Sequence, residues 1–148
     1  MSSYRRIIYH LVFRTYNGEE TLPQENSRLL FAYIMGIIKK KGCHLYRING
    51  MEDHIHILSD LHPSVALADY IRDIKASSTL WMKTQPEFRG FKGWAEGYAA
   101  LTYANSDKDK VIAYIKNQQE HHKKTTFIEE YRQLLLEHDI SIDEKFFP

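Results

Sequence analysis

The chain has 148 residues and a formal net charge of +1 at pH 7, with 43% hydrophobic and 26% charged residues. This length suits one domain with its own core, and the composition is ordinary for a soluble globular protein. The near-neutral charge gives no general attraction to a polyanion, so any contact with nucleic acid would depend on local clusters of Lys and Arg. The single cysteine, Cys43, excludes an intramolecular disulfide and the zinc motifs built on paired cysteines. Without a signal-peptide core or a membrane-spanning apolar stretch, the expected location is cytoplasmic.

Apolar patterns divide the first two thirds of the chain into six elements. β-branched and aromatic residues favour strands, whereas apolar residues that recur every three or four positions favour helices. The pair Asn49-Gly50 marks a tight turn, so the strands on either side of it should form an antiparallel hairpin. The predicted elements are a strand over 4–15, a helix over 23–41, strands over 43–50 and 52–58, a helix over about 63–84 and a strand over 97–104.

Two further helices are expected after the last strand. Residues 106–109 resemble a capping box, which would start a helix that runs to about His121 or His122. Residues 126–129 form a second capping box, which would start a C-terminal helix that runs to about Glu137.

The order strand, helix, strand, strand, helix, strand is that of a ferredoxin-like or RRM-like α+β fold. Such a fold has an antiparallel sheet with helices on one face and leaves the other face open for ligands or partners. The chain is interpreted as one domain over residues 1–148, with a core over about 4–122 and a C-terminal helical extension over about 125–148.

Two histidines alternate with isoleucines in the strand expected over 52–58. Because side chains in a strand alternate between faces, His54 and His56 should share one face and Ile55 and Ile57 the other. Two imidazoles side by side provide a geometry that suits a divalent metal ion. The pattern alone is weak, because a half-buried strand can carry histidines on its polar face without binding a metal.

The helix after the last strand carries Tyr114 and Gln118 one turn apart. Residues four positions apart lie on one helical face, and Val111 and Ile115 beside them should turn that face toward the sheet. A tyrosine hydroxyl and an amide oxygen could then approach a metal held by the two histidines. The plainer interpretation is an amphipathic helix with a tyrosine at the edge of the core.

These two motifs resemble those of a known family. His54-Ile-His56 is similar to the HUH motif, in which two histidines surround a hydrophobic residue, and Tyr114-Ile-Lys-Asn-Gln118 is similar to the nucleophile helix of single-tyrosine HUH transposases. In this order and on this topology, they resemble REP-associated tyrosine transposases and related insertion-sequence transposases. The resemblance covers most of the chain.

The resemblance implies DNA transposition by cleavage and rejoining of a single strand. Tyr114 would attack a DNA phosphate and form a 5′-phosphotyrosine link with release of a 3′-hydroxyl, while His54, His56 and Gln118 would bind Mg²⁺ or Mn²⁺. The implied partners are single-stranded DNA with hairpin elements and a second copy of the chain in a homodimer. Coordination preferences alone would favour Zn²⁺ or Mn²⁺ for two imidazoles, so Mg²⁺ rests on the resemblance.

Basic residues are the candidates for contacts with DNA phosphates. In the loop over 85–94 they alternate with aromatic residues, which suits single-stranded nucleic acid but also suits packing of the loop. His121 and His122 fit the family's Glu-His-His pattern, but they are interpreted as the polar end of a helix and not as metal ligands. The candidate DNA contacts are Arg14, Lys75, Arg89, Lys92, Lys116, Lys123 and Lys124.

Two other functions remain open at this point. An RRM-like module could bind DNA or RNA hairpins without cleaving them, although such a module has no need of Tyr114 together with the histidine pair. A metal-dependent hydrolase could use a water nucleophile at the histidines. That hydrolase would have only Asp53 or Glu52 as an obvious general base and would leave Tyr114 unexplained.

Overall fold

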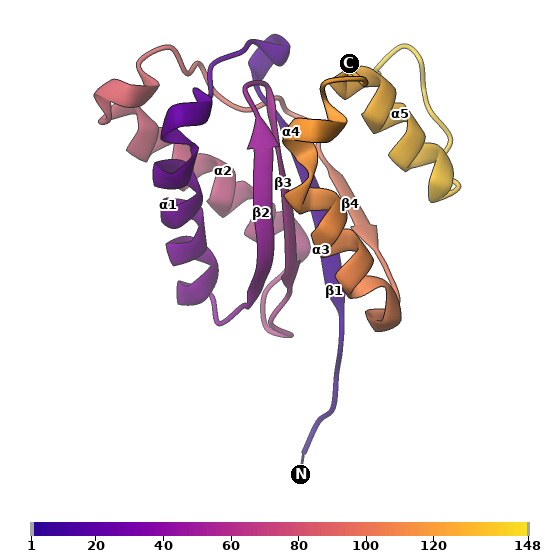
Figure 1. The fold of residues 1–148 in the computed structure, drawn as a ribbon. Coiled ribbons are helices and arrows are strands. Elements are labelled where there is room, and N and C mark those ends of the chain that lie inside the picture. The colour runs from indigo at the N-terminus through magenta and orange to yellow at the C-terminus, as the bar shows by residue number, and fades with distance from the viewer. Residues whose placement is uncertain (1, 148) are drawn as a thin grey trace.

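A four-stranded antiparallel sheet in the order β2-β3-β1-β4 forms the centre of the molecule (Figure 1). This computed structural model describes residues 2–147. The predicted α+β class and the order of the first six elements are confirmed. The strands are β1 (Ile8–Arg14), β2 (Leu45–Met51), β3 (His54–Asp60) and β4 (Ala99–Thr102), and the helices are α1 (Ser27–Lys40), α2 (Leu67–Lys83), α3 (Lys108–Lys116), α4 (Gln118–His121) and α5 (Phe127–Glu137).

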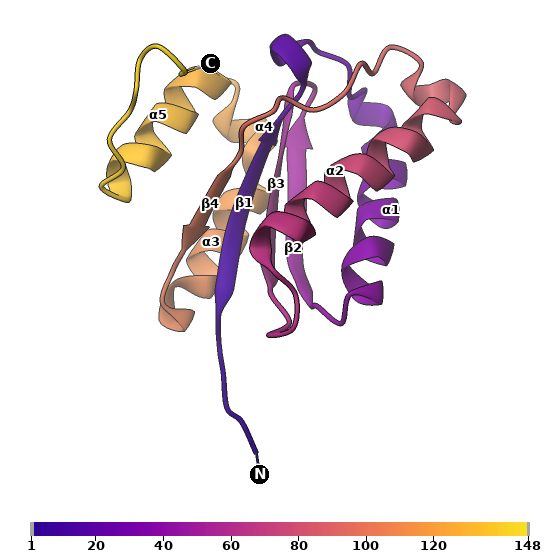
Figure 2. The ribbon, with the colours of Figure 1, turned by 180° about the vertical axis from the view of Figure 1, so that it is seen from behind.

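Helices α1 and α2 cover one face of the sheet and enclose the main core (Figure 2). β1 and β3 turn alternate residues to this face, as the two-residue period of a strand requires. The apolar stripe of α1 consists of Leu30, Ile34 and Ile38, which recur every four residues and are almost fully buried. The strand residues in this core are Leu11, Phe13, Ile55 and Ile57, and those from α2 are Tyr70, Ile71, Ile74 and Met82.

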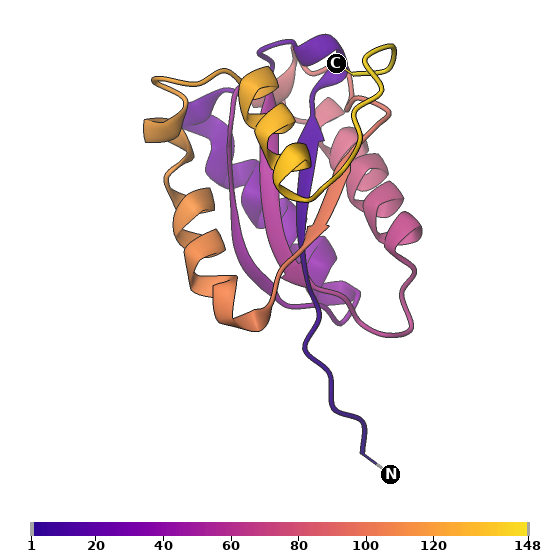
Figure 3. The ribbon, with the colours of Figure 1, turned by 90° about the vertical axis from the view of Figure 1, so that its right-hand side faces the viewer.

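The opposite face was expected to be open, and this prediction is wrong. Helix α3 packs Val111 and Ile115 against Leu58 of β3, and α5 packs Phe127 and Leu134 against β1 and β4. Figure 3 shows α3 and α4 on the side of the sheet away from α2, with α5 in front of the strands. The order of elements predicts the helices but not the face they cover, because that depends on the connections after β4.

Two local predictions about the last helices have opposite outcomes. The box at Thr126 and Glu129 is confirmed, because the Thr126 side chain accepts from the Glu129 amide and the Glu129 side chain accepts in return from the Thr126 amide. The box at residues 106–109 is wrong, because α3 begins after Asp107 without any side-chain cap. The helix expected to run to His121 or His122 is interrupted at Asn117, so Gln118 starts the short helix α4.

Within residues 2–147, every helix is too short or too polar to cross a membrane.

The turn expected at Asn49-Gly50 is wrong, because both residues lie within β2, where they pair with His56 and Ile55, and the turn falls at Glu52 and Asp53. The hairpin instead places two strand backbones in close contact at Gly50. A Cβ at this position would approach Ile55 Cα to 2.8 Å and would clash with the carbonyl oxygen of His54. Gly50→Ala should therefore lower the free energy of unfolding by about 1–3 kcal/mol, as overpacking does. Chemical denaturation measures this effect. The matched control is Gly36→Ala in α1, where no atom lies within 4 Å of the new Cβ, and this variant should be as stable as the parent or up to about 1 kcal/mol more stable.

Candidate active site

The two histidines of β3 lie on the face of the sheet that α3 and α5 cover. His54 and His56 are completely buried, and Ile55 and Ile57 point into the main core, as predicted. On the neighbouring strand β1, Arg14 is paired with His54 in the strand register. His10 of β1 approaches from the same side, with its Nε2 at 2.7 Å from His56 Nδ1. The sheet thus fixes three imidazoles in one buried group.

Helices α3 and α4 bring Tyr114 and Gln118 to these histidines. Gln118 is completely buried, and its Oε1 accepts a hydrogen bond of 3.0 Å from His54 Nε2. The ring centroid of Tyr114 lies 5.9 Å from that of His56. All four residues that the sequence motifs single out therefore lie together, although the chain separates the two motifs by more than fifty residues.

Glu130 of α5 occupies the centre of this site and was not predicted from the sequence. It is 3% exposed, and its Oε1 lies 3.3 Å from His54 Nε2 and 3.2 Å from His56 Nε2. Its Oε2 accepts hydrogen bonds from Gln118 Nε2 at 2.8 Å and from the hydroxyl of Tyr114. The available signal was its position between Phe127 and Leu134, which makes it a charged residue in the apolar stripe of the helix.

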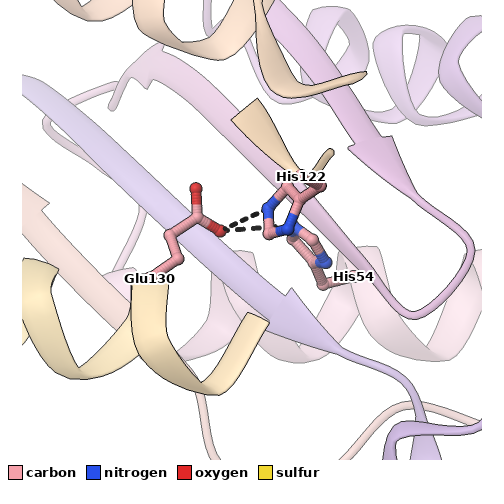
Figure 4. Close-up of side chains that lie close together, drawn as sticks. All are labelled: His54, His122 and Glu130. Atoms are coloured by element: carbon pink, nitrogen blue, oxygen red, sulfur yellow. Dashed lines mark hydrogen bonds and ion pairs between the residues drawn. The ribbon is translucent and has the colours of Figure 1, made fainter. Parts of the chain in front are cut away.

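His122 also belongs to the site, which corrects the interpretation of this residue as the polar end of a helix. Its Nε2 lies 3.0 Å from Glu130 Oε1, as Figure 4 shows, and its Nδ1 donates to the carbonyl oxygen of Thr125 at 2.7 Å. His121 is more distant, with its Nε2 3.6 Å from Glu130 Oε2. The helix break at Asn117 is what lets the chain after Gln118 turn His122 inward.

The hydrogen bonds decide how the rings are protonated. A carbonyl or carboxylate oxygen only accepts, so Nδ1 of His122, bonded to Thr125, and Nδ1 of His54, bonded to Asp53 at 2.7 Å, must carry hydrogen. A neutral ring would then turn the lone pair of Nε2 toward the carboxylate of Glu130. The contact between the Nε2 of each ring and the Glu130 carboxylate is therefore attractive only if that Nε2 also carries a proton, or if a cation lies between the ring and the carboxylate.

The pKa values differ in direction between the two β3 histidines. Burial lowers the pKa of His54, but the carboxylates of Asp53 and Glu130 outweigh this effect and raise it to about 9. Burial lowers the pKa of His56 below its usual value, and the partial compensation by Glu130 is not sufficient to reverse this. Burial and the adjacent Glu130 raise the pKa of Tyr114, so its hydroxyl keeps its proton in this arrangement.

A cluster of His54, His122 and Glu130 could bind a metal ion. One ligand atom from each of these residues lies within 4.8 Å of the others. The outer nitrogens of both rings are fixed by hydrogen bonds to Asp53 and Thr125, and metal-binding histidines usually have such partners. Imidazole nitrogens with one carboxylate suit divalent ions such as Mn²⁺ and Zn²⁺.

The candidate DNA contacts are distributed unevenly around this site. Arg14 is next to His54 in the sheet, and Lys123 and Lys124 line a hollow beside His122. Lys116 is exposed at the end of α3. The other three have partners away from the histidines, because Lys75 donates to the carbonyl oxygens of residues 95–97, Arg89 donates to Pro86 and Lys92 pairs with Glu19.

The match of most of the chain to a family model identifies the class of protein as a transposase. Residues 3–118 match the family described as "Transposase IS200 like", and the chain belongs to this family, whose members act in DNA transposition. The match ends at Gln118, so His122 and Glu130 lie beyond it.

Two curated relatives are known transposases. The chain is 24% identical to the ISDra2 transposase TnpA of Deinococcus radiodurans, with 74% of this chain and 82% of that protein covered. It is also 24% identical to the transposase for insertion sequence element IS200 of Salmonella typhimurium, with 78% of each chain covered.

Two solved structures share the fold. A putative transposase from Deinococcus radiodurans superposes with a TM-score of 0.61 at 25% identity, with 80% of this chain and 95% of that chain covered. A REP-associated tyrosine transposase bound to a REP hairpin superposes with a TM-score of 0.61 at 18% identity, with 82% and 74% covered. The fold and the recognised family therefore agree with the resemblance found in the sequence motifs.

The raised pKa of His54 predicts a pH dependence of the metal-free protein. A group that holds its proton more tightly when folded stabilises the fold below its unfolded pKa of 6.5, and this contribution is lost as the pH rises through the folded pKa of about 9. The lowered pKa values of His10 and His56 affect stability only below this range. With a chelator present, the free energy of unfolding should fall by up to about 3 kcal/mol as the pH rises from 6.5 to about 9.

Denaturation curves at several pH values measure this loss. Asp53→Asn removes the carboxylate next to His54 and should flatten the dependence, whereas Asp109→Asn at an exposed position of α3 should leave it unchanged. A stability that stays constant or increases over this range would contradict the assignment of a protonated His54.

Proposed function

We propose that this transposase cleaves and rejoins single-stranded DNA with Tyr114 as the nucleophile and with help from a divalent metal ion. The observation that carries the proposal is the meeting of the Tyr114 hydroxyl and three imidazoles at one buried carboxylate, Glu130. A structural tyrosine at the edge of the core needs none of these partners, whereas a nucleophile must lie beside the groups that bind the scissile phosphate.

The reaction exchanges one phosphoester for another. The Tyr114 oxygen forms a bond to phosphorus and loses its proton to solvent, while the bond to the 3′-oxygen breaks and that oxygen takes up a proton from water. The products are a 5′-phosphotyrosine and a free 3′-hydroxyl, and rejoining reverses the step with another strand end. The number of phosphoester bonds is unchanged, so no nucleotide hydrolysis is required.

The charge of the site supports the participation of a metal ion. The hollow that leads to Tyr114 has a volume of about 340 Å³ and is lined by Glu129, Glu130 and Glu137, which repel a phosphate. A divalent ion held by these residues would supply positive charge that offsets Glu130, and it would polarise the phosphate and favour the phenolate. Without it, burial and Glu130 favour the protonated phenol.

The metal ligands that we propose extend the set implied by the sequence motifs. His54, His56 and Gln118 remain candidates, and His122 and Glu130 join them because their ligand atoms converge on the same point. A set with three imidazoles favours Mn²⁺ over Mg²⁺, which prefers oxygen ligands. Arg14, Lys123 and Lys124 are the basic residues best situated to hold the DNA strand next to this ion.

The proposed substrate is single-stranded DNA that carries hairpin elements. A solved transposase with this fold was bound to a REP hairpin, and this property is extended to the present chain as part of the proposal. The reaction would take place in the cytoplasm. Residues 1–148 would act as one catalytic domain, since the C-terminal extension contributes Glu130.

A homodimer remains the expected assembly. Within one chain, however, Tyr114 already contacts Glu130 beside His54 and His56. We therefore propose that each subunit holds a tyrosine and its own histidine pair in one site, and that a second copy is not needed to assemble the nucleophile with the metal ligands.

Covalent trapping tests the nucleophile. The protein is mixed with labelled single-stranded hairpins from the ends of its own locus in the presence of Mn²⁺ or Mg²⁺, and the products are separated on a denaturing gel. The parent protein should form a covalent adduct. Tyr114→Phe should abolish this adduct because it removes the attacking oxygen, and His56→Ala should abolish it because it removes a metal ligand.

The control for this assay is Tyr16→Phe, which removes an exposed hydroxyl outside the site and should leave the adduct yield unchanged. If the protein binds hairpins tightly but forms no adduct with either metal, the proposed chemistry is wrong and the chain is a non-cleaving hairpin-binding module.

Metal titration tests the extended ligand set without any cleavage. Glu130→Gln should weaken Mn²⁺ binding at least tenfold, measured by calorimetry or by the electron paramagnetic resonance signal of free Mn²⁺, because it removes the only carboxylate among the proposed ligands. Glu129→Gln, on the exposed side of the same helix turn, is the matched control and should bind Mn²⁺ as the parent does. Equal affinities of all three proteins would exclude Glu130 as a ligand.

A further inference from the structure

A second cavity lies beside the site, on the other side of α5. It has a volume of about 350 Å³ and is bounded by β1, the segment before β4, α5 and the C-terminal residues 141–147. Figure 3 shows α5 and this C-terminal segment in front of β1 and β4. We infer that this cavity receives one unpaired nucleobase of the DNA strand, adjacent to the phosphate that Tyr114 attacks. The inference rests on the proposed function for the identity of the strand.

The cavity and the site share a wall. The Phe127 ring lines the cavity, and its centroid lies 4.6 Å from that of His54. Val12 and Arg14 line the cavity from β1 and are the strand partners of His56 and His54. Phe127, in the first turn of α5, lines both this cavity and the hollow beside His122, so a nucleotide linked to a phosphate at the histidines could reach the cavity around the N-terminal end of α5.

Aromatic rings provide stacking surfaces in this cavity. Phe127 and Tyr131 of α5 are stacked with centroids 5.1 Å apart, and Phe147 continues the stack at 5.9 Å from Tyr131. Tyr98, which is 42% exposed, stands at another wall. Rings of this kind bind unpaired bases by stacking, and such contacts account for much of the affinity for single strands. A space of this size also lies at the small end of ligand cavities, which suits one base and not a duplex.

Arg14 brings a hydrogen-bond donor to the wall of the cavity. Its guanidinium carbon lies 5.5 Å from the centre of the Phe127 ring, and its Nε is buried without a hydrogen-bond partner among residues 2–147. A buried unpaired donor is unfavourable, so a ligand that accepts from it would be stabilising. Arginine pairs well with the acceptor atoms on a base edge. Asp143 lines the same cavity, and its negative charge disfavours a second phosphate there.

Selection from a random pool tests this inference without cleavage. Fully randomised single strands are selected for binding to the Tyr114→Phe protein and then sequenced. One position should show a base preference, and an abasic site at that position should weaken binding by about tenfold, as expected for loss of one stacked base. Arg14→Lys keeps the charge but loses the planar donor group, so it should remove the preference.

Two further variants complete the test. Tyr131→Leu should reduce the loss caused by the abasic site to less than about threefold, and Arg28→Gln on α1, on the opposite face of the sheet, should change nothing. The inference is overturned if no position is enriched, or if Arg14→Lys, with unchanged thermal stability, selects the same sequences as the parent. A base preference in a protein that never forms a covalent adduct would support the cavity and refute the tyrosine chemistry. Adduct formation without any base preference would support the tyrosine chemistry and refute the role of the cavity.

Discussion

The buried carboxylate of Glu130 is the constraint on which the rest of the site depends. A negative charge that is 3% exposed is stable only if several donors surround it. Here the donors come from β3, from α3 and α4 and from the loop after α4, so all of these elements must be in place at once. Burial by itself would raise the pKa of Glu130, but hydrogen bonds with His122, His54 and His56 keep this pKa well below its usual range.

Apolar packing on both sides of the carboxylate holds it in position. Val111 and Ile115 attach α3 to one side of the sheet face, and Phe127 and Leu134 attach α5 to the other. The polar residues lie in the gap between these two clusters, where they are shielded from water. Shielding strengthens their mutual interactions, and it also makes any unpaired group among them costly. The same arrangement leaves the catalytic tyrosine candidate only half-buried, at the border with solvent.

Several elements were predictable because their signals are local. The alternation of His54 and His56 with two isoleucines identified both the strand and the face that each residue takes, and the capping box at Thr126 identified the start of α5. The four motif residues were also found, since their spacing resembles that of a known family. The roles assigned to them remain predictions.

The remainder of the site depends on how distant elements pack, which no local pattern contains. The position of Glu130 beside Tyr114 requires α5 to fold back across the sheet, and the inward turn of His122 requires the break at Asn117. Two adjacent glutamates at the start of a helix are common for reasons of the helix dipole alone. The helical spacing of Phe127, Glu130 and Leu134 separates Glu130 from Glu129, but what Glu130 contacts is known only once the partner surface of α5 is known.

The contribution of α5 has a consequence for the order of events during synthesis. A growing chain first acquires the sheet, then Tyr114 and Gln118, and only after them the helix that carries Glu130. Until α5 has left the ribosome and docked, the three elements of the site lack their common partner. A nascent transposase can therefore fold most of its core before it has a complete site, and the site is assembled only after α5 has been synthesised.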